Sequence, residues 1–200
     1  MSEMARQIRL ALIMGSDREG RFCETVTRWA AGQIKERGEF LLDVIDPLEL
    51  SLPTRITREV PEPVRAFRER IRRADAFIIV TPEYNHGYSA ALKTMIDHAD
   101  EEWYAKPVAF VSYGGISGGL RSVEQLRLVF SEVHAVTLRD TVSFHLAWHQ
   151  FDADGEPVKP QVVNGAMTLL LDRLRWWAHA LMRAREAAPY VKARVRQTPA

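Results

Sequence analysis

Short apolar runs and amphipathic stretches alternate along this chain. The first run, Ile8 to Met14, is rich in isoleucine and leucine and ends at Gly15, which predicts a strand buried on both faces. Behind it, apolar residues recur at helical spacing up to Gly38, at Phe22, Val26, Trp29, Ala30 and Ile34. The beginning of the chain therefore predicts one strand followed by one helix.

The same alternation continues to the end of the chain. It predicts further strands over Phe40 to Ile45, Ala76 to Val80, Val108 to Ser112 and, more weakly, Val136 to Val142. It predicts helices around Val64 to Ile71, Ser89 to His98, Val123 to Val133 and Gln161 to Ala187. Five strands alternating with five helices predict an α/β fold: a flavodoxin-like, doubly wound parallel sheet in the order 2-1-3-4-5, with helices on both faces.

The composition is typical of a globular domain. The chain has 200 residues, of which 46% are hydrophobic and 26% charged, and its formal net charge is +1. We expect residues 1–188 to form a single domain and residues 189–200 to form a basic tail with little order. Basic and acidic residues are interleaved, so no positive stripe for nucleic acid is present in the sequence.

The location of the protein follows from the same composition. No run reaches the roughly 18 apolar residues needed to cross a bilayer, and the N-terminal residues do not form a signal-peptide pattern. The single cysteine, Cys23, excludes an internal disulfide and fits a reducing compartment. We therefore expect a cytoplasmic protein with neither a membrane nor a nucleic acid as its partner.

Three of the predicted strands end in unusually polar loops. The first strand continues into GSDREGRFCE (residues 15–24), the third into TPEYNHGYS (81–89) and the fourth into SYGGISGGLRS (112–122). Ligands of open α/β sheets bind outside the carboxyl ends of the strands, where the strand order reverses, and strands one, three and four are neighbours in this order. We therefore expect the three loops to converge on one site.

The first of these loops has the composition of a phosphate site. It combines Gly15, Ser16, Arg18, Gly20 and Arg21 directly before a helix. A helix N-terminus offers unpaired N–H groups and a partial positive charge, and hydroxyl and guanidinium groups add further donors for a phosphate. Neither a Walker A motif nor G-x-G-x-x-G occurs in the chain. The alternative interpretation is an ordinary turn with exposed arginines.

The loop after the fourth strand contains Gly114, Gly115, Gly118 and Gly119. Glycine allows the backbone to approach a ligand closely, so its N–H and C=O groups can line the edge of a flat heterocycle. A loop that is merely flexible has the same composition. Together with the phosphate loop and the Pro-Glu-Tyr-Asn segment, this loop predicts a site for a flat ring with a phosphorylated tail.

The three motifs resemble those of the NADPH-dependent FMN reductase family of flavodoxin-like flavoproteins, which includes quinone, azo-dye and chromate reductases. The resemblance extends over roughly residues 8–142 and preserves the order and spacing of all three motifs. It implies bound FMN, NADPH as co-substrate, and a homodimer or homotetramer. It also implies that the first loop holds the FMN phosphate, that the Pro-Glu-Tyr-Asn segment contacts the flavin, and that the Gly-rich loop borders the ring.

The resemblance assigns the cofactor contacts to particular residues of this sequence. The phosphate contacts would be Ser16, Arg18, Arg21, Phe22 and Cys23. The flavin contacts would be Pro82, Glu83, Tyr84 and Asn85, and the ring-edge contacts would be Ser112, Tyr113, Gly114 and Gly115. Many family members have Ser and Asn where this chain has Arg21 and Cys23, and the backbone N–H groups at these two positions can still serve as donors.

The leading hypothesis is an enzyme that passes electrons from NADPH through bound FMN to a small acceptor by a ping-pong mechanism. The acceptor classes are a quinone, a flavin, an azo dye or a metal oxyanion. No catalytic side chain is assigned, because hydride transfer from nicotinamide to flavin requires no protein base. One alternative is a flavodoxin-type electron carrier, although such carriers tend to be strongly acidic. The other is a scaffold that binds phosphate or a nucleotide without redox work.

Two further features have alternative interpretations. His145 and His149 are four residues apart, but no third ligand is nearby in the sequence, and we expect no metal site. The last predicted helix has a stripe of apolar positions that includes Leu174 and Trp177, and it has further apolar residues at Leu169, Leu171 and Trp176, more than a single buried stripe requires. This excess predicts either an oligomer interface or packing against residues 143–160.

Overall fold

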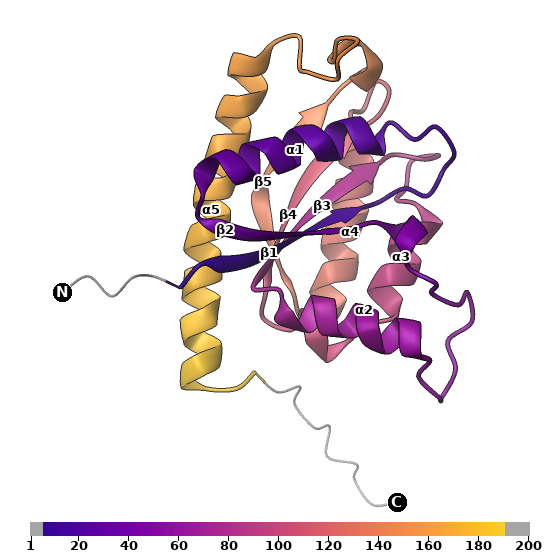
Figure 1. The fold of residues 1–200 in the computed structure, drawn as a ribbon, viewed down its shortest axis with the longest axis vertical. Helices are drawn as coiled ribbons and strands as arrows, with labels where there is room; N and C mark the ends of the chain where they lie inside the picture. Colours follow the sequence, from indigo (N-terminus) through magenta and orange to yellow (C-terminus); the bar gives the residue numbers. More distant parts are fainter. Residues whose placement is uncertain (1–5, 191–200) are drawn as a thin grey trace, which may run out of the picture.

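The computed structural model describes residues 6–190, and its elements follow the predicted alternation. Five parallel strands form one sheet in the order β2-β1-β3-β4-β5 (Figure 1). The strands are β1 (Ile8–Met14), β2 (Phe40–Ile45), β3 (Ala76–Pro82), β4 (Pro107–Tyr113) and β5 (Val136–Phe144). The helices are α1 (Cys23–Arg37), α2 (Glu62–Arg73), α3 (Ala90–Asp97), α4 (Leu120–Glu132) and α5 (Pro160–Ala187). The predicted fold class and strand order are confirmed.

Strands β3, β4 and β5 reach further toward their carboxyl ends than the apolar pattern predicts, whereas β1 and β2 end where it places them. The prediction placed the end of β3 at Val80, whereas the ladder continues through Thr81 to Pro82, which pairs with Tyr113 of β4. Tyr113 in turn pairs with Phe144 of β5. Residues of the predicted polar loops therefore belong to the sheet because they pair with neighbouring strands. The apolar pattern of a single segment does not reveal this pairing.

Three short 3-10 helices were not predicted from the sequence. They are η1 (Pro47–Glu49), η2 (Glu101–Trp103) and η3 (Ala147–His149). Each has only three residues, which is too short to produce a helical hydrophobic period.

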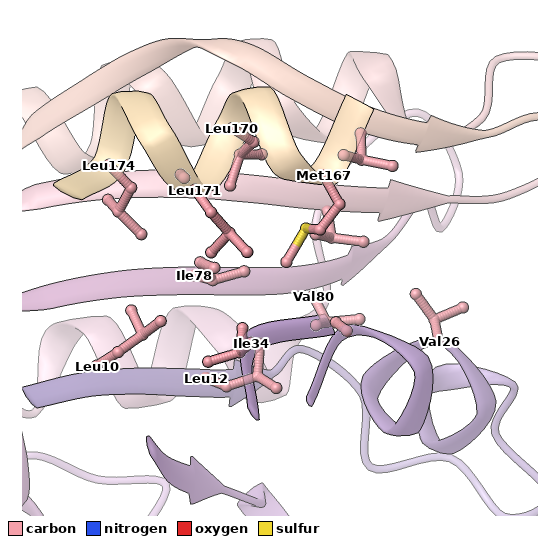
Figure 2. Packing of buried hydrophobic residues seen from close by; sticks show 14 of the residues in the cluster. Leu10, Leu12, Val26, Ile34, Ile78, Val80, Met167, Leu170, Leu171 and Leu174 are labelled. Atoms are coloured by element: carbon pink, nitrogen blue, oxygen red, sulfur yellow. The ribbon is translucent and has the colours of Figure 1, made fainter. Parts of the chain in front are cut away.

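Side chains that alternate along the central strands form two separate cores. Leu10 and Leu12 of β1 pack on the face covered by α1 and α5, whereas Ala11 and Ile13 pack on the face covered by α2, α3 and α4. Figure 2 shows the first core, in which leucines of α5 lie over Ile78 of β3. Because both faces are buried, the strands read as continuous apolar runs in the sequence.

Helix α5 keeps an apolar face that the described chain does not cover. Its inner stripe is buried, but Leu169 remains 47% exposed and Trp176 64% exposed. Trp177, which the sequence pattern placed in the inner stripe, is also exposed, because the helix turns it outward. Packing against residues 143–160 therefore does not cover the apolar excess of this helix.

The two ends of the chain fall largely outside the described residues. Lys192, Arg194 and Arg196 of the predicted basic tail lie there, so the prediction of little order is not addressed. Tyr190 is described, and its hydroxyl lies 2.7 Å from Nδ1 of His134. Between residues 6 and 190, no helix combines the length and the apolar character that a membrane crossing requires.

Lys106, directly before β4, is a buried cation at the amino end of the sheet. The residue is only 7% exposed. Its ammonium group donates to the carbonyls of Ile71 (2.8 Å) and Arg72 (2.9 Å) at the end of α2. Burial, together with the positive charge of Arg185, lowers the pKa of Lys106 to about 7.

The lowered pKa predicts a pH-dependent contribution to stability. Between pH 7 and about 10 the unfolded chain holds the Lys106 proton more strongly than the folded chain, so the free energy of unfolding rises with pH in this window. We expect wild type to gain stability relative to Lys106→Met from pH 7 to pH 9.5, measured by urea unfolding. A difference between the two proteins that is the same at every pH would contradict this.

Candidate functional site

The loops after β1, β3 and β4 meet at the carboxyl edge of the sheet, as the sequence predicts. In Figure 1 this edge lies at the end of the sheet opposite the chain's N-terminus. The Ser16 hydroxyl of the first loop lies 2.7 Å from the Tyr84 hydroxyl of the second. The N–H of Glu83 donates to the carbonyl of Tyr113 at the start of the third (3.2 Å). Hydrogen bonds thus connect all three loops.

Gly15 allows the first loop to leave the sheet in close contact with β3. Its N–H donates to the carbonyl of Val80 at 2.8 Å, and a Cβ at this position would lie 2.7 Å from that same oxygen. The carbonyl of Gly15 accepts from the Ser89 hydroxyl (2.6 Å), which also caps the N-terminus of α3. The start of the loop is therefore fixed on both sides.

Ser16, Arg18 and Tyr84 form a group of donors beside the start of α1. The Arg18 guanidinium carbon lies 3.6 Å from the centroid of the Tyr84 ring, a cation–π contact that leaves the guanidinium exposed. Helix α1 begins after Phe22 with no side-chain cap, and of its first turn the N–H of Glu24 makes only a long bond of 3.5 Å to the carbonyl of Arg21. These donors at an uncapped helix start match the needs of a phosphate.

The Arg21 side chain does not face the predicted phosphate site. The guanidinium is buried, and it donates to the carbonyl of Ser16 (2.6 Å) and to both carboxylate oxygens of Asp46, which follows β2. The hydrogen bond with Asp46 raises the pKa of Arg21, against the opposing effect of burial. The side chain therefore braces the first loop from the β2 side, and only the backbone of Arg21 remains for a ligand.

Phe22 and Cys23 contribute packing at the same helix start. The Phe22 ring contacts Tyr113 and Phe151, with ring centroids 6.1 Å and 5.5 Å apart. The Cys23 side chain is completely buried, and burial raises the pKa of its thiol. A thiol with a raised pKa is a poor nucleophile, so Cys23 acts as a small core residue.

Tyr113 carries a buried hydroxyl that has no hydrogen-bond partner of normal geometry among the described residues, although the Ser16 hydroxyl and the Cys23 thiol lie near it. The residue is only 6% exposed, and it projects from the end of β4 toward α1. Burial and the neighbouring Cys23 raise the pKa of the phenol, so the hydroxyl keeps its proton. Leaving such a group unpaired costs about 1–3 kcal/mol. An unpaired donor under the first loop fits a ligand with acceptor oxygens at this position, as a phosphorylated cofactor has.

Glu83 joins the second loop to the start of α4. One of its oxygens accepts from the Arg121 guanidinium (2.9 Å) and the other from the Arg121 N–H (3.2 Å). Burial alone would raise the pKa of Glu83, but hydrogen bonds from Ser117 and Arg121 outweigh it and lower the pKa. The carboxylate is therefore ionised and engaged, and its contribution to a site is to hold the loop.

The remainder of the second loop is a tight two-residue turn. Tyr84 and Gly87 exchange two backbone hydrogen bonds of 2.9 and 3.0 Å, and the intervening Asn85 and His86 have φ of 50° and 68°. Two positive φ values define a type I′ turn, which asparagine tolerates well. Pro82 lies within β3, and Asn85 is exposed at the tip of the turn.

The Gly-rich loop is held in place, which argues against the alternative of a merely flexible loop. Gly119 has a φ of 85°, and a Cβ there would lie 2.8 Å from the backbone nitrogen of Tyr113. The hydroxyls of Ser112 and Ser143 both donate to the carbonyl of Gly118 at 2.8 Å. Ser112 thus supports the loop from below instead of facing a ligand, while the backbone of Gly114 and Gly115 lies at the edge.

A segment that the sequence did not predict also belongs to this edge. Residues 145–149, which follow β5, donate backbone hydrogen bonds from Leu146 to Gly115 (2.8 Å) and from Ala147 to Gly114 (3.1 Å). His145 lies 2.8 Å from the carbonyl of Ile116 through Nδ1. Among residues 6–190, His145 and His149 do not join a group of three potential metal ligands. The signal in the sequence that this segment is more than a connection was the large aromatic residue Trp148, whose side chain the structure leaves exposed.

Comparison with known proteins identifies relatives over most of the chain. A family model described as NADPH-dependent FMN reductase matches residues 8–149. A probable NADPH:quinone oxidoreductase from Oryza sativa is 31% identical over 181 residues, which cover 85% of this chain and 89% of that protein. An NAD(P)H-dependent FMN reductase from Schizosaccharomyces pombe is 39% identical over 120 residues, which cover 56% of this chain and 60% of that protein.

Solved structures share the fold at lower identity. The flavoenzyme FerB, an NAD(P)H:acceptor oxidoreductase from Paracoccus denitrificans, superposes with a TM-score of 0.71 at 22% identity. The match covers 86% of this chain and 98% of that one. An NADH:FMN oxidoreductase in its apo form gives a TM-score of 0.66 at 18% identity, over 85% of this chain and 89% of that one.

The unpaired hydroxyl of Tyr113 gives a prediction in which stability and binding change in opposite directions. Tyr113→Phe removes a buried group without a partner, so the FMN-free protein should be as stable as wild type or more stable by about 1 kcal/mol in urea unfolding. Its FMN affinity, measured by fluorescence quenching, should fall about tenfold or more because one hydrogen bond to the ligand is lost.

Tyr84→Phe is the matched control, because its hydroxyl already bonds to Ser16. This variant should lower the stability of the FMN-free protein. Loss of stability in Tyr113→Phe, or an FMN affinity equal to that of wild type, would show that the Tyr113 hydroxyl does not contact the ligand.

Proposed function

The chain belongs to the NADPH-dependent FMN reductase family, whose members are oxidoreductases that use FMN with NAD(P)H as electron donor, and on that premise we propose its specific reaction. The protein passes electrons from NADPH by way of bound FMN to a small acceptor. The observation that carries the proposal is the meeting of Ser16, Arg18 and the unpaired Tyr113 hydroxyl at the uncapped start of α1.

The proposed cofactor contacts divide between side chains and backbone. The Ser16 hydroxyl, the Arg18 guanidinium and the first N–H groups of α1 bind the phosphate. Tyr84 and the backbone of residues 82–85 lie along the flavin, and the backbone of Gly114 and Gly115 borders its ring. FMN, when bound, supplies the chemistry by accepting a hydride and passing on its electrons.

The protein's own part in this reaction is to bind and orient. Hydride transfer to a flavin requires no protein acid or base, and the Glu83 carboxylate is ionised and paired with Arg121, while the Tyr113 phenol keeps its proton. With a quinone as acceptor, NADPH and a proton yield NADP⁺ and the hydroquinone, and the proton comes from solvent at this open edge. A cytoplasmic location would provide the NADPH that the reaction consumes.

A quinone is the acceptor class we favour. Three relatives that this chain matches over most of their length are named NADPH:quinone oxidoreductases, two of them as probable. The rival function is an electron carrier of the flavodoxin type. Such carriers tend to be strongly acidic in order to dock on their partners, whereas this chain has a formal net charge of +1. The charge therefore favours the enzyme.

The proposal predicts a ping-pong mechanism. If NADP⁺ must leave before the acceptor enters, the two half-reactions are separated by a modified form of the enzyme. Double-reciprocal plots against acceptor at several NADPH concentrations should then be parallel for each acceptor in a panel of quinones, flavins, azo dyes and metal oxyanions. Lines that intersect would reject the ping-pong mechanism and indicate a site that holds both substrates together.

The exposed apolar face of α5 supports a homodimer or homotetramer as the functional form. Leu169 and Trp176 are exposed on a helix whose other side is already buried, and a patch of this kind is typical of an interface. Light scattering at micromolar concentration should give at least twice the chain mass of 22.8 kDa. Trp176→Lys should reduce it to the chain mass, whereas Leu48→Lys, at an exposed position after β2, should not. A monomeric wild type would contradict this.

A further inference from the structure

Three large apolar side chains are exposed beside the Gly-rich loop. Trp148 is 56% exposed, Leu146 44% and Ile116 86%. Ile116 belongs to the Gly-rich loop itself, and the other two belong to the segment of residues 145–149. The cofactor contacts proposed above make no use of these side chains. Exposed apolar groups close to a functional edge call for an explanation in terms of binding.

The segment that carries Leu146 and Trp148 is firmly held. Backbone bonds connect it to Gly114 and Gly115, and its His145 lies within hydrogen-bond distance of the carbonyl of Ile116. Leu146 has a φ of 47°, in the left-handed region that a leucine rarely adopts. Such strain persists where the surroundings determine the backbone closely, and it is concentrated at functional sites.

Trp148 extends from this segment over the Gly-rich loop. Its Cη2 atom lies 3.9 Å from the position that a Cβ on Gly115 would occupy. Gly115 is one of the two residues whose backbone borders the ring in the proposed function. The tip of the indole therefore stands next to the edge of the ring site, and more than half of the residue is exposed.

We propose that Trp148, flanked by Ile116 and Leu146, binds the flat aromatic acceptor next to the flavin and selects it over charged inorganic acceptors. The proposal rests on the proposed function, because it assigns the acceptor to that same site. An indole offers a flat apolar surface on which an aromatic ring stacks, and it gives a hydrated anion no comparable gain. Three side chains are few beside the 20–30 residues per side of a stable protein interface, so a small ligand fits better than a second copy.

The test measures acceptor binding without turnover. The probe, 2-methyl-1,4-naphthoquinone, is titrated by calorimetry into the oxidised, FMN-loaded protein in the absence of NADPH. We expect Trp148→Ala to weaken quinone binding about tenfold and Trp148→Phe to retain most of it, because an aromatic ring preserves the stacking surface. FMN affinity should be unchanged in both variants. Leu128→Ala, at an exposed position on α4, is the matched control and should bind the quinone as wild type does.

Steady-state kinetics gives the second readout. In Trp148→Ala the KM for the quinone should rise about tenfold, while the KM for ferricyanide, a hydrated anionic acceptor, should not change. Unchanged quinone affinity would overturn the proposal, as would equal losses for quinone and ferricyanide. A fall in the oligomer mass of Trp148→Ala would also overturn it, by showing that a second copy covers the indole. Failure of the proposed function is recognised separately, because wild type would then bind no FMN, or its bound flavin would not be reduced by NADPH or NADH.

Discussion

The close approach of β1 to β3 at Gly15 is the constraint on which the site depends. A side chain at this position would collide with the carbonyl of Val80, and only glycine allows the 2.8 Å hydrogen bond between the two strands at the point where the first loop begins. From there the chain passes directly beside Tyr84, so that Ser16 reaches its hydroxyl. The position of the first donors is thus set by the packing of two strands.

The loops around this point are held by ion pairs in which several of their charged side chains are already engaged. Arg21 is committed to Asp46, and Glu83 is committed to Arg121. What remains available is an uncapped helix start, the exposed guanidinium of Arg18 and the hydroxyl of Tyr113. Such a site binds and orients, and it leaves the redox chemistry to a cofactor, as in the family to which the chain belongs.

The fold could be predicted from the sequence because local patterns determine it. Strands buried on both faces and amphipathic helices each have a period that a single segment reveals, and parallel topology follows from their alternation. The convergence of the three loops followed from the strand order in turn. The predicted phosphate role of the Arg21 side chain, by contrast, depended on a partner 25 residues away, and no local pattern identifies Asp46 among the acidic residues.

Other features of the site were hidden for related reasons. The 3-10 helix that carries Trp148 is three residues long, and its bonds to the Gly-rich loop join segments about 30 residues apart in the chain. The missing partner of the Tyr113 hydroxyl is a property of packing in three dimensions, because a tyrosine at the end of a strand is more often satisfied. Sequence therefore predicted where the three loops meet, and the structure shows which of the side chains there are already paired.

The central claim, that this chain is a reductase acting through bound FMN, is tested most directly by anaerobic rapid mixing of the FMN-loaded protein with NADPH in the absence of any acceptor. The visible absorbance of the flavin should disappear in a single turnover and return when a quinone is added. A flavin that stays bound and oxidised with both NADPH and NADH would contradict the claim and leave the chain as an electron carrier.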